Sequence, residues 1–301
     1  MARPLVAAAP AGAPAVPAVI ELLKPITWFP PMWAYACGLV SSGSPVDGRW
    51  FDVVLGVLLA GPLVCGTSQA VNDWFDRHVD AINEPGRPIP SGRIPGRWGL
   101  YVAILWTLLS IAVAASLGPR ALAAGTVGLL LAWAYSAPPL RLKRNGWVGN
   151  GAVGACYEGL PWFTGAAILA GSMPGIEVVT LALLYSVGAH GIMTLNDFKS
   201  IEGDRRMGIA SLPAQLGVRR AAWVACVVMA VPQAIVVAAM VSWGHPAGAC
   251  VVAALLAAQL TLMRRFLVDP SARATWYSAA GVGLYVLGMM TCACALRIGA
   301  P

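Results

Sequence analysis

Long apolar segments alternate with short polar ones along most of the 301-residue chain. A helix needs about 20 mostly apolar residues to cross a bilayer, and continuous apolar runs are unlike the alternating strands of a membrane β-barrel. The sequence therefore predicts an all-α bundle of nine transmembrane helices in a membrane domain at residues 21–301. The predicted spans are 24–42, 51–71, 98–118, 120–137, 149–171, 176–196, 219–242, 245–263 and 275–296.

The first 20 residues form a different kind of segment, rich in Ala and Pro. Prolines at positions 4, 10, 14 and 17 oppose the continuous helical core of a signal peptide. Residues 1–20 are therefore expected to be a disordered cytoplasmic tail.

Composition and charge agree with a membrane protein. The chain is 58% apolar and 11% charged, with a mean hydropathy of +0.71, whereas a soluble domain carries about a quarter charged residues. With the N-terminus in the cytoplasm, 17 of the 20 Lys and Arg residues lie on the cytoplasmic side, and only Arg49, Arg120 and Arg297 lie opposite. Cytoplasmic segments carry the basic excess in membrane proteins. The net charge of +7 thus reflects membrane topology rather than nucleic-acid binding. With nine spans, the C-terminus is predicted to lie on the side of the membrane opposite the cytoplasm.

Seven of the 13 acidic residues lie in two clusters, each opening with Asn-Asp at the cytoplasmic end of a predicted span. At 100° per residue, the four side chains from Asn72 to Asp80 fall within an arc of about 100° on one helix. If the helix of the second cluster continues, Asn196, Asp197 and Asp204 lie on one face and Glu202 lies off it. Gly203 can break this helix. The first cluster comprises Asn72, Asp73, Asp76, Asp80 and Glu84, and the second comprises Asn196, Asp197, Glu202 and Asp204.

Carboxylates this close together repel one another unless a cation neutralises them. Clusters of oxygen ligands favour Mg²⁺ over zinc, and Mg²⁺ commonly bridges carboxylates and substrate phosphates. The alternative is two solvated acidic helix ends, with Arg77 and Arg205 as counter-ions. The predicted metal ligands are Asn72, Asp76, Asp80, Asp197, Glu202 and Asp204.

Basic side chains surround both clusters on the same side of the membrane. Basic side chains beside predicted metal ligands indicate that the site binds a diphosphate, because Arg and Lys bind phosphates well. The chain has no P-loop motif, so nucleotide-driven transport is not supported. The candidate diphosphate-binding residues are Arg77, Arg87, Arg141, Lys143, Lys199 and Arg205.

These motifs resemble the intramembrane prenyltransferase family of the ubiquinone-biosynthesis type, over about residues 20–296. Many members carry an acid where this chain has Ser200, which leaves open which second-motif acid touches metal. The stretches that carry the family resemblance are NDWFDRHVD (72–80), YSAPPLRLK (135–143) and NDFKSIEGDRRMGIASLP (196–213). Those that resemble its chlorophyll-forming branch are NGWVGN (145–150), YEGLPW (157–162) and GAHGIMTLNDFK (188–199).

The resemblance implies a Mg²⁺-dependent enzyme that esterifies the propionate of bacteriochlorophyllide with a geranylgeranyl or phytyl diphosphate. It implies an inner or intracytoplasmic photosynthetic membrane, and partners among pigment-biosynthesis or light-harvesting assembly proteins. It adds Tyr135 to the diphosphate-binding candidates. The implied catalytic residues are Asn72, Asp73, Asp76, Asp80, Asp197 and Asp204.

Other readings stay open at this point. Chlorophyllide, a haem-type porphyrin or a quinone-precursor acid could be the acceptor. A cation or metabolite transporter could also use the acidic clusters, but a transporter site is expected near the bilayer midplane. Both clusters here lie at one membrane face, which favours chemistry on an amphiphilic substrate.

Two acidic or basic residues, Glu158 and His190, lie well inside predicted spans, away from the span ends. Such residues are energetically costly in a bilayer and are functional candidates by default. Glu158 could orient the pigment, and His190 could ligate its central magnesium. A hydrogen bond between helices is the alternative for each of them.

Overall fold

The structure is a computed structural model that describes residues 12–299, and each predicted span falls on a helix in this part of the chain. The all-α class is therefore confirmed. The main helices are α2 (Phe29–Ser41), α3 (Trp50–Leu58), α4 (Gly66–Asn83), α5 (Trp98–Ser116), α6 (Pro119–Ser136), α7 (Gly146–Gly154), α8 (Leu160–Ala170), α9 (Ile176–Asp197), α12 (Val218–Ser242), α13 (Pro246–Val268) and α14 (Pro270–Gly299).

Six helical segments within residues 12–299 are long and apolar enough to cross a membrane. They are the continuous α3–α4 segment (Trp50–Asn83), α5, α9, α12, α13 and α14. The helices α2 and α6 and the α7–α8 segment are not among the six, so the count of nine spans stays a prediction.

The N-terminal segment differs from the expected disordered tail. Residues 1–11 lie outside the described part, but α1 (Val16–Leu23) already includes residues 16–20. Pro17 lies in the first turn, where backbone N–H groups have no acceptor within the helix. The N–H that proline lacks therefore costs no hydrogen bond there. Leu22 and Leu23 are buried in a cluster with Ala70 of α4, which stabilises α1.

The first predicted span also begins later than expected. Lys24 has a left-handed backbone with φ of 48°, and a short 3₁₀ turn, η1 (Pro25–Thr27), follows it. The helix α2 starts only at Phe29. Lys24 therefore lies at a corner between α1 and the bundle.

Two helical segments are interrupted by π-helical turns. One turn, η2 (Leu59–Cys65), joins α3 to α4 and contains Pro62. The other, η4 (Ala155–Gly159), joins α7 to α8. Such turns occur often at functional sites, and both supply residues to the cavity described below.

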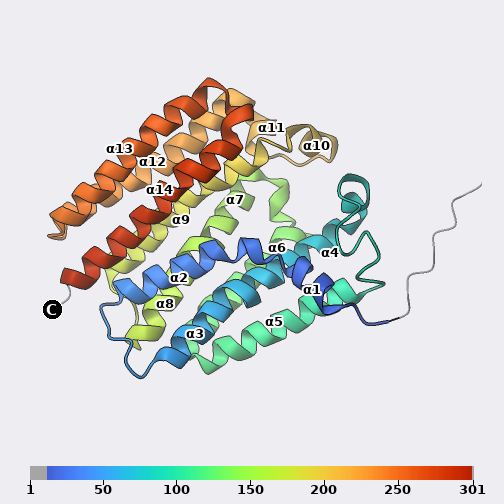
Figure 1. Cartoon of the computed structure of the whole chain (residues 1–301), viewed down its shortest axis with the longest axis horizontal. Coiled ribbons are helices and arrows are strands. Elements are labelled where there is room, and N and C mark those ends of the chain that lie inside the picture. The colour runs from blue at the N-terminus through green and yellow to red at the C-terminus, as the bar shows by residue number, and fades with distance from the viewer. Residues whose placement is uncertain (1–11, 300–301) are drawn as a thin grey trace, which may run out of the picture.

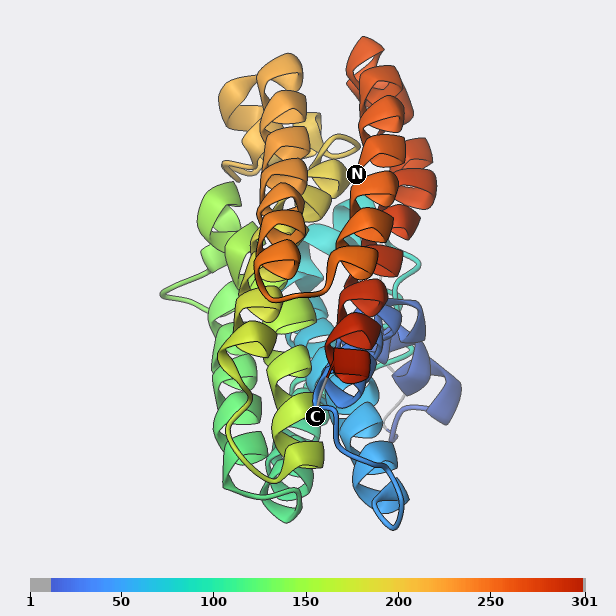
Figure 2. The ribbon, with the colours of Figure 1, turned by 90° about the vertical axis from the view of Figure 1, so that its left-hand side faces the viewer.

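The helices form one bundle with a polar end. In Figure 1, α9 and α12–α14 occupy one side and α2–α5 and α8 the other, and Figure 2 shows the helices running in roughly one direction. The short helices α10 (Ile201–Arg206) and α11 (Leu212–Leu216) lie at the same end as the C-terminus of α4. The described chain starts near that end, and its C-terminus lies at the opposite one.

Candidate active site

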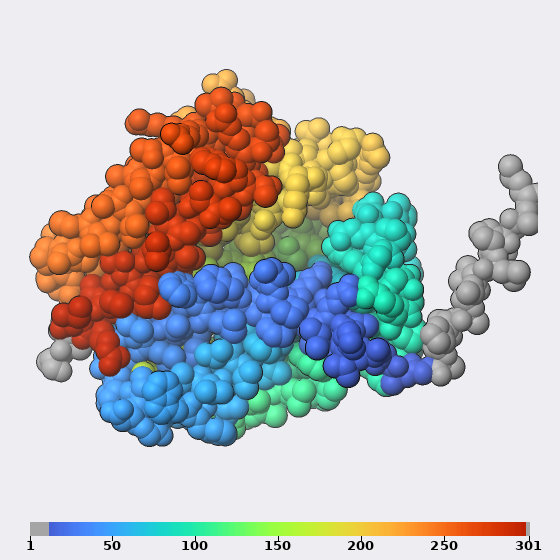
Figure 3. All heavy atoms as spheres, viewed as in Figure 1, coloured from blue at the N-terminus to red at the C-terminus, as the bar shows by residue number. Residues whose placement is uncertain are grey.

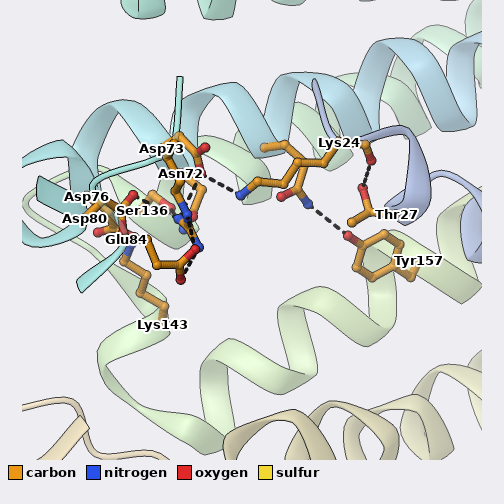
Figure 4. Close-up of polar contacts among 12 residues, drawn as sticks. Lys24, Thr27, Asn72, Asp73, Asp76, Asp80, Glu84, Ser136, Lys143 and Tyr157 are labelled. Carbon is orange, nitrogen blue, oxygen red and sulfur yellow. Dashed lines mark hydrogen bonds and ion pairs between the residues drawn. The ribbon is translucent and has the colours of Figure 1, made fainter. Parts of the chain in front are cut away.

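The first acidic motif lies on one face of α4, as predicted, because this helix continues through Asn83. Asp73 is only 1% exposed, and its Oδ1 accepts a hydrogen bond from Lys24 Nζ at 2.7 Å. Arg87 reaches the same oxygen at 3.4 Å and Asp80 Oδ2 at 2.9 Å. Figure 4 shows Lys24 and Asp73 joined beside Asn72. Basic side chains from two other segments therefore hold the buried part of the motif.

Asp76 is paired with the loop between α6 and α7. Lys143 Nζ lies 2.5 Å from Asp76 Oδ2, and Arg141 lies 3.5 Å from Oδ1. Burial lowers the pKa of the Lys143 ammonium, while the negative charge of Asp76 acts in the opposite direction. A further anion beside Lys143 would stabilise its charged form.

The second motif is built differently from the predicted helical face. The helix α9 ends at Asp197 and α10 begins only at Ile201, so the helix does not continue through the motif, and the break falls at residues 198–200 rather than at Gly203. Ser200 Oγ donates to the Asp197 carbonyl at 3.2 Å, the kind of local bond with which Ser competes with a helix. Asp204 is buried, and its Oδ2 accepts from Ser200 at 3.1 Å and from Ser211 at 2.6 Å.

Tyr135 of α6 lines the same cavity as Asn72 of the first motif, and the adjacent Ser136 accepts a hydrogen bond from the Asn72 amide at 3.2 Å. Asp197 Oδ2 in turn lies 3.4 Å from the Asn150 amide of α7. The fold therefore brings both motifs to one place, with α6 and α7 between them.

A backbone contact links the α6–α7 loop to the second motif. The Gly146 N–H donates to the Ala210 carbonyl at 2.8 Å, and the Ala210 N–H donates to the Arg144 carbonyl at 2.9 Å. A Cβ atom on Gly146 would lie 2.7 Å from the Leu212 nitrogen, closer than real Cβ atoms come. This close approach requires glycine, and it fixes the loop that carries Lys143 against the segment that carries Asp204.

Several predicted residues lie away from this centre. Glu202 is exposed and pairs with Arg206 at 3.1 Å. The Arg77 guanidinium turns back along its own helix and lies 4.1 Å from the centre of the Trp74 ring. Three other candidates are exposed to solvent, namely Asn196, Lys199 and Arg205.

The two intramembrane candidates have different surroundings. Glu158 is 4% exposed in η4, near Cys37 and Tyr285, and its Oε2 has no hydrogen-bond partner among the described residues. His190 packs against Trp147, with ring centres 5.7 Å apart, and its Nδ1 likewise has no partner in the described structure. Trp147 is 44% exposed, so this pair lies near the outer surface of the bundle.

Sequence reasoning missed three residues that hold the acids. Lys24 was counted only as a topology signal, although its place before Pro25 at the cytoplasmic end of a span puts it at the depth of the motifs. Asn150 and Ser211 bind Asp197 and Asp204. Both occur in stretches that resemble the family, but only the folded chain shows which acid each one reaches.

A cavity of about 200 Å³ lies below the acidic motifs. Asn72 and Tyr135 belong to its wall, together with the Tyr157 hydroxyl, which accepts a hydrogen bond from Gln69 at 3.3 Å. The remaining wall is mainly apolar and comes from α4, η2, α6, α7, η4 and α9. Figure 3 shows the molecule hollowed between the blue and the yellow-to-red helices, with green residues at the bottom.

The donor chemistry of the two motifs fits a hard cation. Within residues 12–299 no three Asp, Glu, His or Cys side chains converge as a preformed metal cluster, because each carboxylate is held by basic, amide or hydroxyl groups. The side-chain atoms of the two motifs that could bind a metal are nevertheless oxygen atoms, which Mg²⁺ prefers. Asp73 Oδ2 is buried without a hydrogen-bond partner in the described structure, while its other oxygen is held by Lys24 and Arg87.

Comparison with known proteins identifies the fold. The chain is 59% identical over 288 residues to the bacteriochlorophyll synthase 33 kDa chain of Cereibacter sphaeroides, covering 96% of this chain and 95% of that one. It is 39% identical to the chloroplastic chlorophyll synthase of Arabidopsis thaliana, covering 92% and 73%. A solved UbiA homologue from Archaeoglobus fulgidus, bound to GPP and Mg²⁺, superposes with a TM-score of 0.67 at 21% identity, covering 91% and 99%. The UbiA prenyltransferase family itself matches residues 27–291, and the chain belongs to this family.

Proposed function

We propose that this enzyme transfers a polyprenyl group, geranylgeranyl or phytyl, from its diphosphate to the propionate of bacteriochlorophyllide. One observation carries the proposal: an apolar cavity whose polar end lies beside two acidic motifs and their basic partners. A prenyl diphosphate has the same division into an apolar chain and an anionic head. The high identity to bacteriochlorophyll synthases supports the pigment as acceptor.

The reaction is a substitution at the first carbon of the prenyl group. A propionate oxygen forms the new C–O bond, and the bond to the diphosphate breaks with its electron pair staying on the leaving diphosphate. Arg87, Arg141 and Lys143 are placed to bind that growing negative charge. A carboxylate is already ionised near neutral pH, so no side chain has to remove a proton.

The metal belongs to the same proposal. Mg²⁺ would supply positive charge that stabilises the departing diphosphate. The hydrogen bond from Lys24 to Asp73 then holds the face of α4 that carries the motif in position. The residues that would hold the metal are Asn72, Asp76, Asp80, Asp197 and Asp204, whereas Glu202 points to solvent with Arg206.

His190 is the better placed of the two intramembrane candidates for a pigment contact. Its ring packs against that of the exposed Trp147, so the pair forms an aromatic surface near the outside of the bundle. A flat macrocycle arriving from the lipid could lie on this surface. Glu158 is buried and is not among the residues that line the cavity, which favours a role in helix packing.

The activity is tested with purified protein, Mg²⁺ and geranylgeranyl diphosphate. We expect ester formation and diphosphate release with bacteriochlorophyllide, and a lower kcat/KM with chlorophyllide. Repeating the assay with His190→Ala tests the pigment contact, which predicts a higher KM for pigment and an unchanged KM for the diphosphate. Absence of ester with either pigment would contradict the proposed acceptor.

We also propose that both motifs face the cytoplasm of an inner or intracytoplasmic membrane. The basic residues support this, and the ends of the described chain lie at opposite ends of the bundle. Single cysteines in a cysteine-free protein provide the measurement. Cysteine at Ser91 should react from the cytoplasmic side, and cysteine at the exposed Ile298 from the other side. Labelling of both from one side would mean that the number of crossings is even.

A further inference from the structure

A cluster of five arginines lies at one end of α12, α13 and α14. In Figure 1 the start of α12 and the turn from α13 to α14 lie together, at the end of the bundle that carries α11. The same apolar core joins these three ends, since Ala222, Phe266 and Ala274 are buried in one cluster. The arginine cluster comprises Arg219, Arg220, Arg264, Arg265 and Arg273.

The positive charge of the arginine cluster is largely unmatched. Within residues 12–299 none of the five guanidinium groups forms an ion pair with a carboxylate. At the candidate active site, by contrast, Lys24, Arg87 and Lys143 each pair with an aspartate. Asp269 is the only acidic residue after position 217, and its Oδ1 accepts a hydrogen bond from the Ala272 N–H at the start of α14. The cluster therefore attracts anions from outside the chain.

An exposed face of α12 extends from the arginine cluster along the apolar part of this helix. Trp223, Val227 and Val231 are each about half exposed. Together with the exposed Arg220 they fall within an arc of about 80°, at about 100° per residue. The helix is long and apolar enough to cross a membrane, so this face contacts lipid. Tryptophan one turn below a basic residue is typical of the level of lipid headgroups.

We propose that the arginine cluster binds the headgroup of an anionic phospholipid, whose acyl chains lie along the exposed face of α12. Guanidinium groups donate paired hydrogen bonds to phosphate oxygens, and basic clusters at the ends of membrane helices recognise anionic lipids. An acidic protein segment would match the charge of the cluster, but it would leave the apolar face below Trp223 without a partner. The lipid matches both parts.

This lipid site is separate from the candidate active site. The acidic motifs and their cavity involve α4, α6, α7 and α9, whereas the arginine cluster lies on α12, α13 and α14. The inference goes beyond the proposed prenyl transfer and does not depend on it, so it is tested by lipid binding alone.

Native mass spectrometry of the full-length protein in a neutral detergent measures the binding of dioleoylphosphatidylglycerol and of dioleoylphosphatidylcholine. We expect the wild-type protein to bind the anionic lipid about tenfold more tightly, because each arginine near an anionic headgroup contributes roughly a fivefold factor in affinity. The double variant Arg219→Gln, Arg220→Gln should lose most of this preference. Glycerol phosphate, which has the phosphate but no acyl chains, should bind at least about tenfold more weakly than the anionic lipid, since each buried CH₂ group adds to the affinity.

The matched control is the double variant Arg97→Gln, Arg144→Gln. It removes two exposed arginines from the connections that precede α5 and α7, outside the arginine cluster. The control should keep the wild-type preference for the anionic lipid. Loss of the preference in the control as well would mean that only net charge matters, and it would overturn the inference.

Two other results would also overturn the inference. One is equal affinity of the wild-type protein for the two lipids, or for glycerol phosphate and the anionic lipid. The other is a wild-type preference in the Arg219→Gln, Arg220→Gln variant. If this variant does not fold, the double variant Arg264→Gln, Arg265→Gln decides in the same way, since both arginines are exposed at the end of α13.

Discussion

Asp76→Asn is expected to lower the rate of prenyl transfer about a hundred- to a thousandfold. Removal of one group that stabilises transition-state charge has an effect of this size. Asp76 pairs with Lys143 at 2.5 Å and Arg141 at 3.5 Å. The substitution keeps the size of the side chain but removes the charge that orients the two basic groups, and it replaces a proposed carboxylate ligand of the metal by an uncharged amide. The measurement is the initial rate at saturating Mg²⁺ with both substrates.

The control for this substitution is Asp47→Asn. Asp47 is exposed in the α2–α3 loop, whereas Asp76 lies on α4 beside the candidate site. The control should keep the wild-type rate, which shows that loss of one negative charge is not enough. Retention of half the wild-type rate by Asp76→Asn would contradict the metal and diphosphate assignments together.

Removal of divalent cations is expected to stop the reaction completely. Chelation with EDTA should abolish ester formation, and Mg²⁺ should restore it, because the candidate ligands of the two motifs are oxygen atoms. Zinc prefers nitrogen and sulfur ligands and should not replace Mg²⁺. ATP should have no effect, since the chain lacks a P-loop.

A thermal unfolding curve accompanies the chelation experiment. The carboxylates are held by Lys24, Arg87 and Lys143 in the described structure, so the folded state should persist after chelation. Full activity in metal-free buffer would contradict the assignment of Mg²⁺ as the required cation. Loss of activity together with unfolding would indicate a structural cation instead.

The features that the sequence predicts correctly are local ones. Apolar runs located the helices, because a membrane helix satisfies its own backbone hydrogen bonds. The acidic face from Asn72 to Asp80 was predictable because α4 is unbroken there. At the second motif the same reasoning failed, since Ser200 bonds the Asp197 carbonyl at 3.2 Å where α9 ends.

The features that could not be predicted depend on contacts between distant segments. Lys24 reaches Asp73 across 49 positions of the chain, and Asn150 reaches Asp197 across 47. Helical periodicity carries no information about such pairs.

The backbone pairing of Gly146 and Arg144 with Ala210 has a consequence for chimeric enzymes. Residues 141–146 contact Asp76 on one side and the segment from Ala210 to Leu212 on the other. A graft that imports residues 196–213 from a relative would therefore meet a foreign loop at Gly146. Exchange of the loop and the second motif together would preserve the fit between Gly146 and the segment from Ala210 to Leu212.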